Sequence, residues 1–419
     1  MVNAGQRTSL DRRLGTTEAM FIGLGAMVGA GVFVVFAPAA AAAGTTLLLG
    51  LALAAVVAYL NAMASAQLAA SYPTSGGTYV YGRERLGPWW GYIAGWGFVV
   101  GKTASTAAMA LVFAAYLVPE PGLVQRLVAA AAVLALAAVN YRGITKTAWV
   151  AGILVALTLG CLGVVILVGW PGARGGLPSL ACLYCVENWY GVLQSAGLLF
   201  FAFAGYARVA TLGEEVRDPR RTIPRAIQLS LAITVLLYAG VAVAALSTLG
   251  AAELAASSAP LRDVVRAAGF EGLEVFVQLG AAVACLGALL TLMAGIGRTA
   301  LAMARNRDLP QWLAAVHPRF ATPHHAELLL AGVITVVVLM TDIPNAIGFS
   351  SFCVLVYYAI TNLAAFSQVG APRLWPRTLN VLGLVGCLAL AATLPWQSVL
   401  VGTLVLALGV LGRRLAATA

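Results

Sequence analysis

Two short glycine-containing interruptions inside long hydrophobic segments constrain the fold of this chain more than any other feature. The first is Gly25-Ala26-Met27-Val28-Gly29-Ala30-Gly31-Val32-Phe33, and the second is Phe201-Ala202-Phe203-Ala204-Gly205-Tyr206. Backbone N–H and C=O groups inside a bilayer must be paired unless they face protein, water or a ligand. Helices that unwind at both places therefore predict a substrate site near the middle of the membrane. The alternative is that Gly25 and Gly29 only allow two helices to pack closely.

The composition excludes a soluble globular protein. Charged residues make up 10% of the chain and hydrophobic residues 61%, whereas about a quarter of a soluble domain is charged. A membrane-spanning helix needs roughly 20 apolar residues, and we predict about twelve such spans. Their approximate limits are 17–43, 47–70, 88–117, 124–140, 148–170, 191–212, 226–249, 273–297, 326–341, 346–366, 379–394 and 397–412, of which the ninth and eleventh are short.

The distribution of basic residues predicts the orientation in the membrane. Most of the 25 Lys and Arg residues fall in loops or tails on the side of the two termini. Only Arg126, Arg174, Arg262 and Arg266 fall on the opposite side, and Lys102 and Arg208 fall inside spans. Positive loops stay in the cytoplasm. We therefore predict a multi-pass protein of the cell (plasma) membrane with both termini cytoplasmic, whose positive charge meets anionic lipid rather than nucleic acid.

The N-terminus and the cysteines add few constraints. The basic segment Arg7 to Arg13 lacks the short apolar run and cleavage site of a signal peptide, so we expect the first span to be retained. Four cysteines lie within apolar segments as small hydrophobic residues: Cys161, Cys285, Cys353 and Cys387. Cys182 and Cys185 share one loop, where a lone C-x-x-C is weak evidence for a metal. We expect no metal and no cofactor.

The spans divide into two related halves within a single transmembrane domain. The first five spans, 17–170, and the next five, 191–366, each begin with a glycine-broken segment. Because five is odd, the second half is inverted relative to the first. Two accessory helices follow at 379–412.

Four sequence motifs resemble the amino acid–polyamine–organocation permeases along nearly the whole chain. They are GLGAMVGAGVFV at 23–34, YPTSGGTYVYGRERLGPWWGYIAGW at 72–96, FFAFAGYARVATLGEEVRDPRRTIPRAI at 200–227 and GRTALAMARNRDLPQWLAAVHPR at 297–319. The resemblance implies an all-α polytopic membrane protein with the five-plus-five inverted repeat of the leucine-transporter-like fold, two extra helices, and alternating access.

An amino acid zwitterion would fit between the two breaks. Amide groups exposed at Gly29–Gly31, together with the positive end of the following half-helix, suit a carboxylate. The carbonyls of Met27, Phe201 and Ala204 suit an ammonium group. The candidate substrate-binding residues are Met27, Gly29, Ala30, Gly31, Phe201, Ala202, Ala204 and Gly205.

Three residues around the second break are gating candidates. In resembling permeases an aromatic residue at the position of Phe201 covers the substrate from outside, and Tyr206 lies nearby. Arg208 follows the break, where many relatives carry an acidic residue one position earlier and this chain has Ala207. We expect Arg208 to pair with Glu214, Glu215 or a helix carbonyl rather than to contact substrate.

Lys102 is the candidate for proton coupling. It lies near the middle of the third span, where a charge costs about 3 kcal/mol and is usually functional. By the resemblance to arginine/agmatine antiporters, this position faces the substrate site. Burial would favour release of its proton during transport. The alternative is a lysine that snorkels or bonds a carbonyl of a broken helix.

Further polar residues give weaker signals. The eighth span offers no Ser or Thr before Thr291, which argues against a sodium site, and Ser350 and Ser351 are possible hydroxyl contacts for substrate. The charged segment 214–224 would be either an inner gate or a solvated loop. We expect His317, His324 and His325 to lie in a solvated loop.

Together these features predict a secondary active amino acid transporter, proton-coupled and sodium-independent, with neutral amino acids favoured. Its partners would be the substrate, a proton and membrane lipid; the oligomeric state is not specified. An exchanger, or a permease for cationic amino acids or polyamines, is the alternative. A non-transporting sensor or a subunit of a membrane complex would share the motifs. A membrane enzyme is disfavoured, because the only ionisable residues expected within the spans are Lys102 and Arg208.

Overall fold

The protein is helical throughout the part of the chain that the structure describes. A computed structural model of the 419-residue chain describes residues 14–72, 76–118, 120–142, 148–170, 188–212, 216–320, 322–369 and 373–418. Within these ranges the single β-type pairing is an isolated bridge between Leu14 and Val216. The expected all-α class is confirmed.

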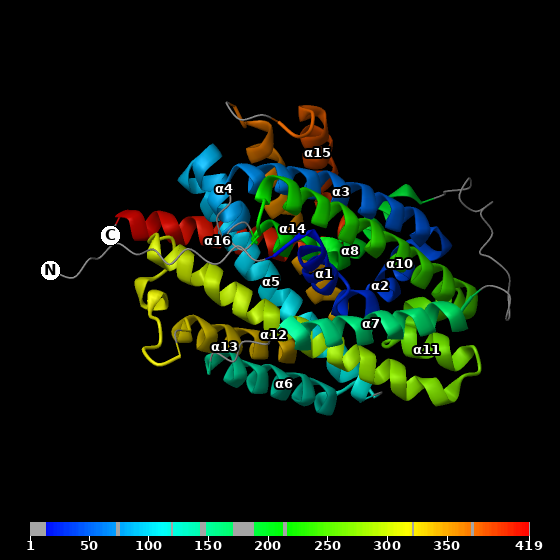
Figure 1. The fold of residues 1–419 in the computed structure, drawn as a ribbon. Coiled ribbons are helices and arrows are strands. Elements are labelled where there is room, and N and C mark those ends of the chain that lie inside the picture. Colours follow the sequence, from blue (N-terminus) through cyan, green and yellow to red (C-terminus); the bar gives the residue numbers. More distant parts are fainter. Residues whose placement is uncertain are drawn as a thin grey trace.

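Each predicted span corresponds to a helix or to a pair of helices joined by a short turn (Figure 1). In chain order these are α1 (Thr16–Met27) with η1 (Ala30–Phe33) and α2 (Phe36–Ala43), α3 (Leu47–Ser71), α5 (Pro88–Leu117), α6 (Leu123–Tyr141), α7 (Ala148–Val168), α8 (Trp189–Phe203) with η4 (Ala204–Tyr206) and α9 (Ala207–Ala210), α10 (Pro219–Ala256), α12 (Glu274–Arg305), α13 (His324–Met340), α14 (Ile343–Phe366), α15 (Arg377–Thr393) and α16 (Trp396–Thr418). Outside the predicted spans lie α4 (Gly77–Leu86), α11 (Pro260–Ala267) and the 3₁₀ turns η2 (Gly44–Thr46), η5 (Glu271–Leu273) and η6 (Gln311–Ala314).

The lengths of these helices fit a protein that crosses the membrane many times. Among the described residues, nine helical segments are long and apolar enough to span a bilayer, and three apolar helices are shorter. The short ones include α13 and α15, the ninth and eleventh predicted spans, at 17 residues each. The division into two inverted halves remains a prediction.

The helix α5 is the centre of the packing. It contacts α12, α13, α14 and α16, so a helix from the first half lies against several from the second. Small residues make this possible, since a Cβ added to Gly101 would lie 2.6 Å from Cβ of Cys353 on α14. One turn further along α5, the hydroxyls of Ser105 and Ser350 are 2.5 Å apart. Close approach through small residues is the usual basis of helix packing in membranes.

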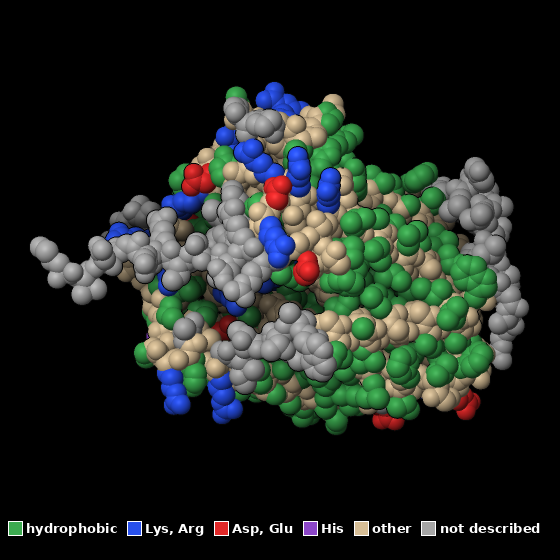
Figure 2. Space-filling view, viewed as in Figure 1, with side chains coloured by type: hydrophobic (Ala, Val, Ile, Leu, Met, Phe, Trp, Pro, Cys, Tyr) green, Lys and Arg blue, Asp and Glu red, His purple; other side chains and the backbone are tan. Residues whose placement is uncertain are grey.

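Charged and hydrophobic side chains occupy different parts of the molecular surface. Figure 2 shows Lys and Arg side chains gathered over the end that carries α4, while the middle of this face is mostly hydrophobic. The four cysteines expected within apolar segments are indeed free and buried. Cys182 and Cys185 lie outside the described residues.

Candidate functional site

The first break interrupts the helix where glycine was expected to do so. α1 ends at Met27, Val28 leaves the helical region with ψ of 55°, and the backbone resumes as the 3₁₀ turn η1. The first two amides of η1, on Ala30 and Gly31, donate no hydrogen bond to any residue that the structure describes. Two N–H groups are therefore available for an acceptor, as at the start of other helices.

The second break is milder than the first. α8 passes at Phe203 into the 3₁₀ turn η4 and then into the four-residue helix α9. Ala204 keeps a helical φ of −65°, but its ψ is 2°, outside the helical range, where α8 gives way to the 3₁₀ turn. Tightening to a 3₁₀ turn changes the pairing of the carbonyls without opening the helix.

The two breaks lie directly against each other. A Cβ added to Gly205 would collide with the carbonyl of Ala26, and one added to Gly31 would lie 3.0 Å from Cα of Ala202. The other wall of the first break is α12, where a Cβ on Gly29 would lie 3.3 Å from Cβ of Ala288. Four of the candidate substrate-binding positions thus share one region of contact between α1, α8 and α12: Gly29, Gly31, Ala202 and Gly205.

Tyrosine hydroxyls bond the carbonyls at both breaks, and the sequence analysis missed them. The hydroxyl of Tyr238 on α10 lies 2.7 Å from the carbonyl oxygen of Met27 and 3.2 Å from that of Ala202. Tyr358 on α14 donates to the carbonyl of Ala204 at 3.3 Å. At the far end of η1, Tyr116 of α5 donates to the carbonyl of Phe33 at 2.9 Å. The available signal was chemical, because a buried tyrosine in an apolar helix needs a partner for its hydroxyl.

These bonds modify the expected role of the carbonyls. Met27 and Ala204, which were expected to accept a substrate ammonium group, each already accept one tyrosine hydroxyl. A carbonyl oxygen has two lone pairs, and that of Met27 also accepts the amide of Gly29 at 2.8 Å, so an ammonium group at Met27 would share or displace one of these bonds. The hydroxyls fix the direction in which those carbonyls point.

Lys102 is buried near the middle of α5, as expected, at 9% exposure. One turn before it, the ring of Phe98 lies 5.5 Å from that of Tyr357 on α14. Tyr358, the next residue of α14, bonds the second break. These contacts bring Lys102 to within about two helical turns of the level of that break. No hydrogen bond or ion pair joins its ammonium group to another described residue.

The gating candidates occupy different environments. Phe201 is 8% exposed, and its ring edge would be 3.5 Å from a Cβ on Gly31. Tyr206 is fully buried, with its ring 5.1 Å from that of Tyr358. Arg208, by contrast, is exposed on α9, and its guanidinium lies 3.5 Å from the hydroxyl of Thr211. Its expected partners Glu214 and Glu215 lie outside the described residues.

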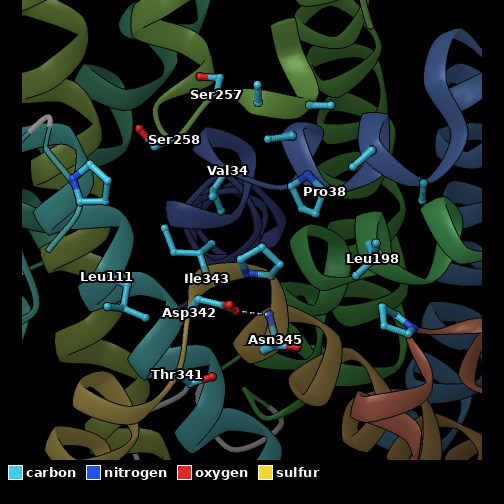
Figure 3. Close-up of a pocket in the computed structure, with 18 of the residues that line it drawn as sticks. Val34, Pro38, Leu111, Leu198, Ser257, Ser258, Thr341, Asp342, Ile343 and Asn345 are labelled. Carbon is cyan, nitrogen blue, oxygen red and sulfur yellow. Dashed lines mark hydrogen bonds between the residues drawn. The ribbon is translucent and has the colours of Figure 1, made fainter. Parts of the chain in front are cut away.

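A cavity of 810 Å³ opens beside the breaks, at the end of α5 away from α4. Figure 3 shows Val34 and Pro38 between Ser257 and Ser258 on one side and Thr341 to Asn345 on the other. Leu111 of α5 and Leu198 of α8 also line it. Phe201 follows Leu198 by one helical turn, and its ring packs near Gly31 of the first break.

Two polar features differ from the sequence expectations. Glu327 lies on α13 within a predicted span, only 3% exposed, so Lys102 and Arg208 are not the only ionisable residues there. The three histidines were expected in a solvated loop, but their rings gather, with centroids 5.3 Å apart for His317 and His324 and 4.2 Å for His324 and His325. Within the described ranges, no group of three ligands is arranged to hold a metal. Of the two serines, Ser350 bonds Ser105, while the hydroxyl of Ser351 has no partner among the described residues.

Comparison with known proteins supports a transporter. The family model for amino acid permeases matches residues 14–408. An uncharacterized transporter of Mycobacterium tuberculosis (strain ATCC 25618 / H37Rv) is 56% identical over 404 residues, covering 96% of this chain and 90% of that protein. The cationic amino acid transporter 7 of Arabidopsis thaliana, described as chloroplastic, is 30% identical over 94% of this chain and 72% of its own length. The branched-chain amino acid permease BcaP of Bacillus subtilis (strain 168) is 27% identical over 93% of this chain and 90% of its own length.

Proposed function

The chain belongs to the amino acid permease family of transporters, and we propose that it is a secondary active amino acid transporter that works by alternating access. The observation that carries the proposal is the contact between the two breaks, where Gly205 lies against Ala26 and Gly31 against Ala202. A ligand bound there touches both halves of the chain. Its binding can therefore favour one arrangement of the halves over another.

The substrate lies with its carboxylate on the free amides of Ala30 and Gly31. Its ammonium group meets the carbonyl oxygens of Met27 and Ala204, whose directions the tyrosine hydroxyls fix. Phe201 separates this site from the 810 Å³ cavity and gates entry from that side. The cavity faces outward, and the arginine-rich end with α4 faces the cytoplasm of a cell enclosed by the plasma membrane.

Coupling is to protons through Lys102, and sodium is not required. The lysine is buried without a carboxylate partner among the described residues, so its charged and neutral forms differ strongly in energy. Its charge also disfavours a cationic substrate side chain, so neutral amino acids are preferred. BcaP is named for branched-chain amino acids, in line with this preference, whereas the Arabidopsis relative is named for cationic ones.

Two alternatives remain as competing proposals. An exchanger, or a permease for cationic amino acids or polyamines, would keep the same backbone site with a neutral Lys102. A non-transporting sensor or complex subunit would keep the fold and bind substrate without moving it.

Counterflow of labelled leucine into liposomes that contain only this protein separates these proposals. The buffer is sodium-free, and unlabelled amino acids and polyamines compete in turn. We expect counterflow that neutral amino acids inhibit best. If arginine is the strongest competitor, the result would favour the cationic permease. If amino acids bind but no counterflow is seen, the result would favour a sensor.

Two glycine substitutions test the site itself. Gly31→Val puts a branched side chain against the backbone of Ala202 and should abolish counterflow. Gly332→Val on α13 is the matched control, because no atom lies within 4 Å of a Cβ added there. A monodisperse Gly31→Val protein that transports at the original rate would show that the backbone does not cradle the substrate.

A further inference from the structure

A buried carboxylate joins three separate elements at the arginine-rich end of the molecule. The side chain of Asp308, only 2% exposed, follows the end of α12. One of its oxygens lies 3.0 Å from a guanidinium nitrogen of Arg83 and accepts the Tyr79 hydroxyl at 2.7 Å; both partners are on α4. The other oxygen lies 2.6 Å from a guanidinium nitrogen of Arg413 on α16. Asn306 in turn donates to the Tyr79 hydroxyl at 3.0 Å.

The phenol of Tyr79 stays protonated in this cluster. Burial and the bond to Asp308 raise the pKa of Tyr79 to about 12. The hydroxyl therefore remains a donor to the carboxylate at any physiological pH.

The backbone is bent to place Asp308 in this position. α12 ends with the amide of Asp308 bonded to the carbonyl of Met303 at 2.8 Å and the amide of Arg307 bonded to that of Ala304 at 3.0 Å. This pattern ends a helix with one left-handed residue, usually glycine. Here the residue is Arg307, with φ of 61°, the one non-glycine position with positive φ in the described ranges. Such strain persists only where the surrounding structure maintains it.

The C-terminal helix is held to the same cluster by several contacts of one side chain. Arg413 donates to the carbonyl of Pro88 at 3.0 Å and lies 4.5 Å from the ring centroid of Trp89 and 4.8 Å from that of Tyr92. A guanidinium group on aromatic faces is favourable, especially when it is partly desolvated. The Arg413 side chain is only 15% exposed. Its contacts connect α16 to the start of α5 as well as to Asp308.

The helix that Asp308 holds also touches the elements around the second break. The hydroxyls of Thr78 on α4 and Thr361 on α14 form a hydrogen bond of 2.7 Å. The backbone amide of Thr78 donates to the hydroxyl of Tyr357 at 3.1 Å. Tyr358, the neighbour of Tyr357, bonds Ala204 of the break. The first turn of α4 is therefore connected through α14 to the second break.

We propose that Asp308 and Arg413 form a latch through which the C-terminal helix holds α4 as a cover on this end of the substrate path. The latch loosens each time the path opens on that side. An accessory helix outside the two repeats thereby sets how readily the transporter opens. This inference rests on the proposed transport function, because a cover matters only where substrate passes.

Labelling of a native cysteine beneath α4 tests the latch. Cys353 lies one helical turn from Tyr357, is fully buried and packs on Gly101. In a protein whose other cysteines are replaced by alanine, a membrane-impermeant maleimide is applied in turn to each side of membrane vesicles. Arg413→Met removes one charge-assisted bond from Asp308, and we expect labelling from the α4 side to become about tenfold faster.

Two further variants make the outcome decisive. Arg266→Met breaks an ion pair of the same 2.6 Å length with Glu274, far from the cluster, and should leave the labelling rate unchanged. Tyr79→Phe removes a single hydroxyl, so it still tests the latch if Arg413→Met does not fold, and we expect a smaller increase. Wild-type labelling rates in the folded variants would overturn the proposal. Because labelling needs no substrate, a latch effect without counterflow would reject only the proposed transport function.

Discussion

Replacing Lys102 with methionine should both stabilise the protein and uncouple it from the proton gradient. Methionine keeps the length of the side chain and removes the charge. The lysine is 9% exposed and has no partner for its ammonium group among the described residues. If its charge serves coupling rather than structure, removing the charge should raise the free energy of unfolding, because residues that serve function often reduce stability.

The size of the gain follows from the burial. A charged lysine at the centre of a membrane helix costs about 3 kcal/mol on insertion scales. Hydrogen bonds to charged groups contribute about 1.5–3 kcal/mol each, so even one bond to the ammonium would offset most of that cost. Without such a bond in the described part of the chain, Lys102→Met should stabilise the protein by up to about 3 kcal/mol. This gain would raise the melting temperature in detergent by several degrees.

The assay combines melting with uptake into liposomes, with and without an acid-outside gradient, in sodium-free buffer. We expect wild-type uptake to follow the gradient, and Lys102→Met to retain exchange but lose accumulation. Lys102→Ala should likewise retain exchange and lose accumulation if the charge of the side chain matters and its packing does not. A Lys102→Met protein that melts lower would show that the ammonium makes a structural bond, and one that still accumulates substrate with the gradient would refute proton coupling through Lys102.

Two further predictions concern Tyr238 and His324. Tyr238→Phe removes the hydroxyl that the carbonyls of Met27 and Ala202 share, and it should weaken the affinity for competing substrate about tenfold. Tyr92→Phe is the control, because the hydroxyl of Tyr92 bonds α16, and its affinity should be unchanged. Equal affinities in the two variants would show that the hydroxyl of Tyr238 does not position the site. Burial and the two neighbouring histidines lower the pKa of His324, so this group stabilises the protein above its ordinary pKa of 6.5 and the contribution is lost as the pH falls below it. Melting temperatures between about pH 8 and about pH 5 should therefore fall less steeply for His324→Gln, and parallel curves would contradict this reasoning.

The sequence predicted the spans and the position of the first break because both depend on local properties. A run of apolar residues specifies a membrane helix whatever surrounds it. The cluster GAMVGAG combines high hydrophobicity with low helix propensity, and α1 ends within it, at Met27. The second break takes the form of a 3₁₀ turn at Gly205 and its neighbours, between α8 and α9.

The polar partners could not be predicted because they are distant in the sequence. Tyr238 lies 211 positions from Met27, and Asp308 lies 225 positions from Arg83. Nothing in a single sequence identifies which of several buried polar groups will meet. The contacts among the three histidine rings could not be predicted for the same reason, because tertiary packing rather than spacing brings the rings together.

Glycine in the two breaks serves close contact more than unusual backbone conformation. Gly29, Gly31 and Gly205 are absent from the described residues with positive φ, so an L-residue could adopt their dihedral angles. There is no space for a side chain at these positions, because Gly205 lies against the carbonyl of Ala26 and Gly31 lies against Cα of Ala202. The sequence offered helix packing and a mid-membrane site as alternatives for this motif. The structure shows the packing, and in the proposed function the same contact keeps the free amides and the tyrosine-held carbonyls within reach of one ligand.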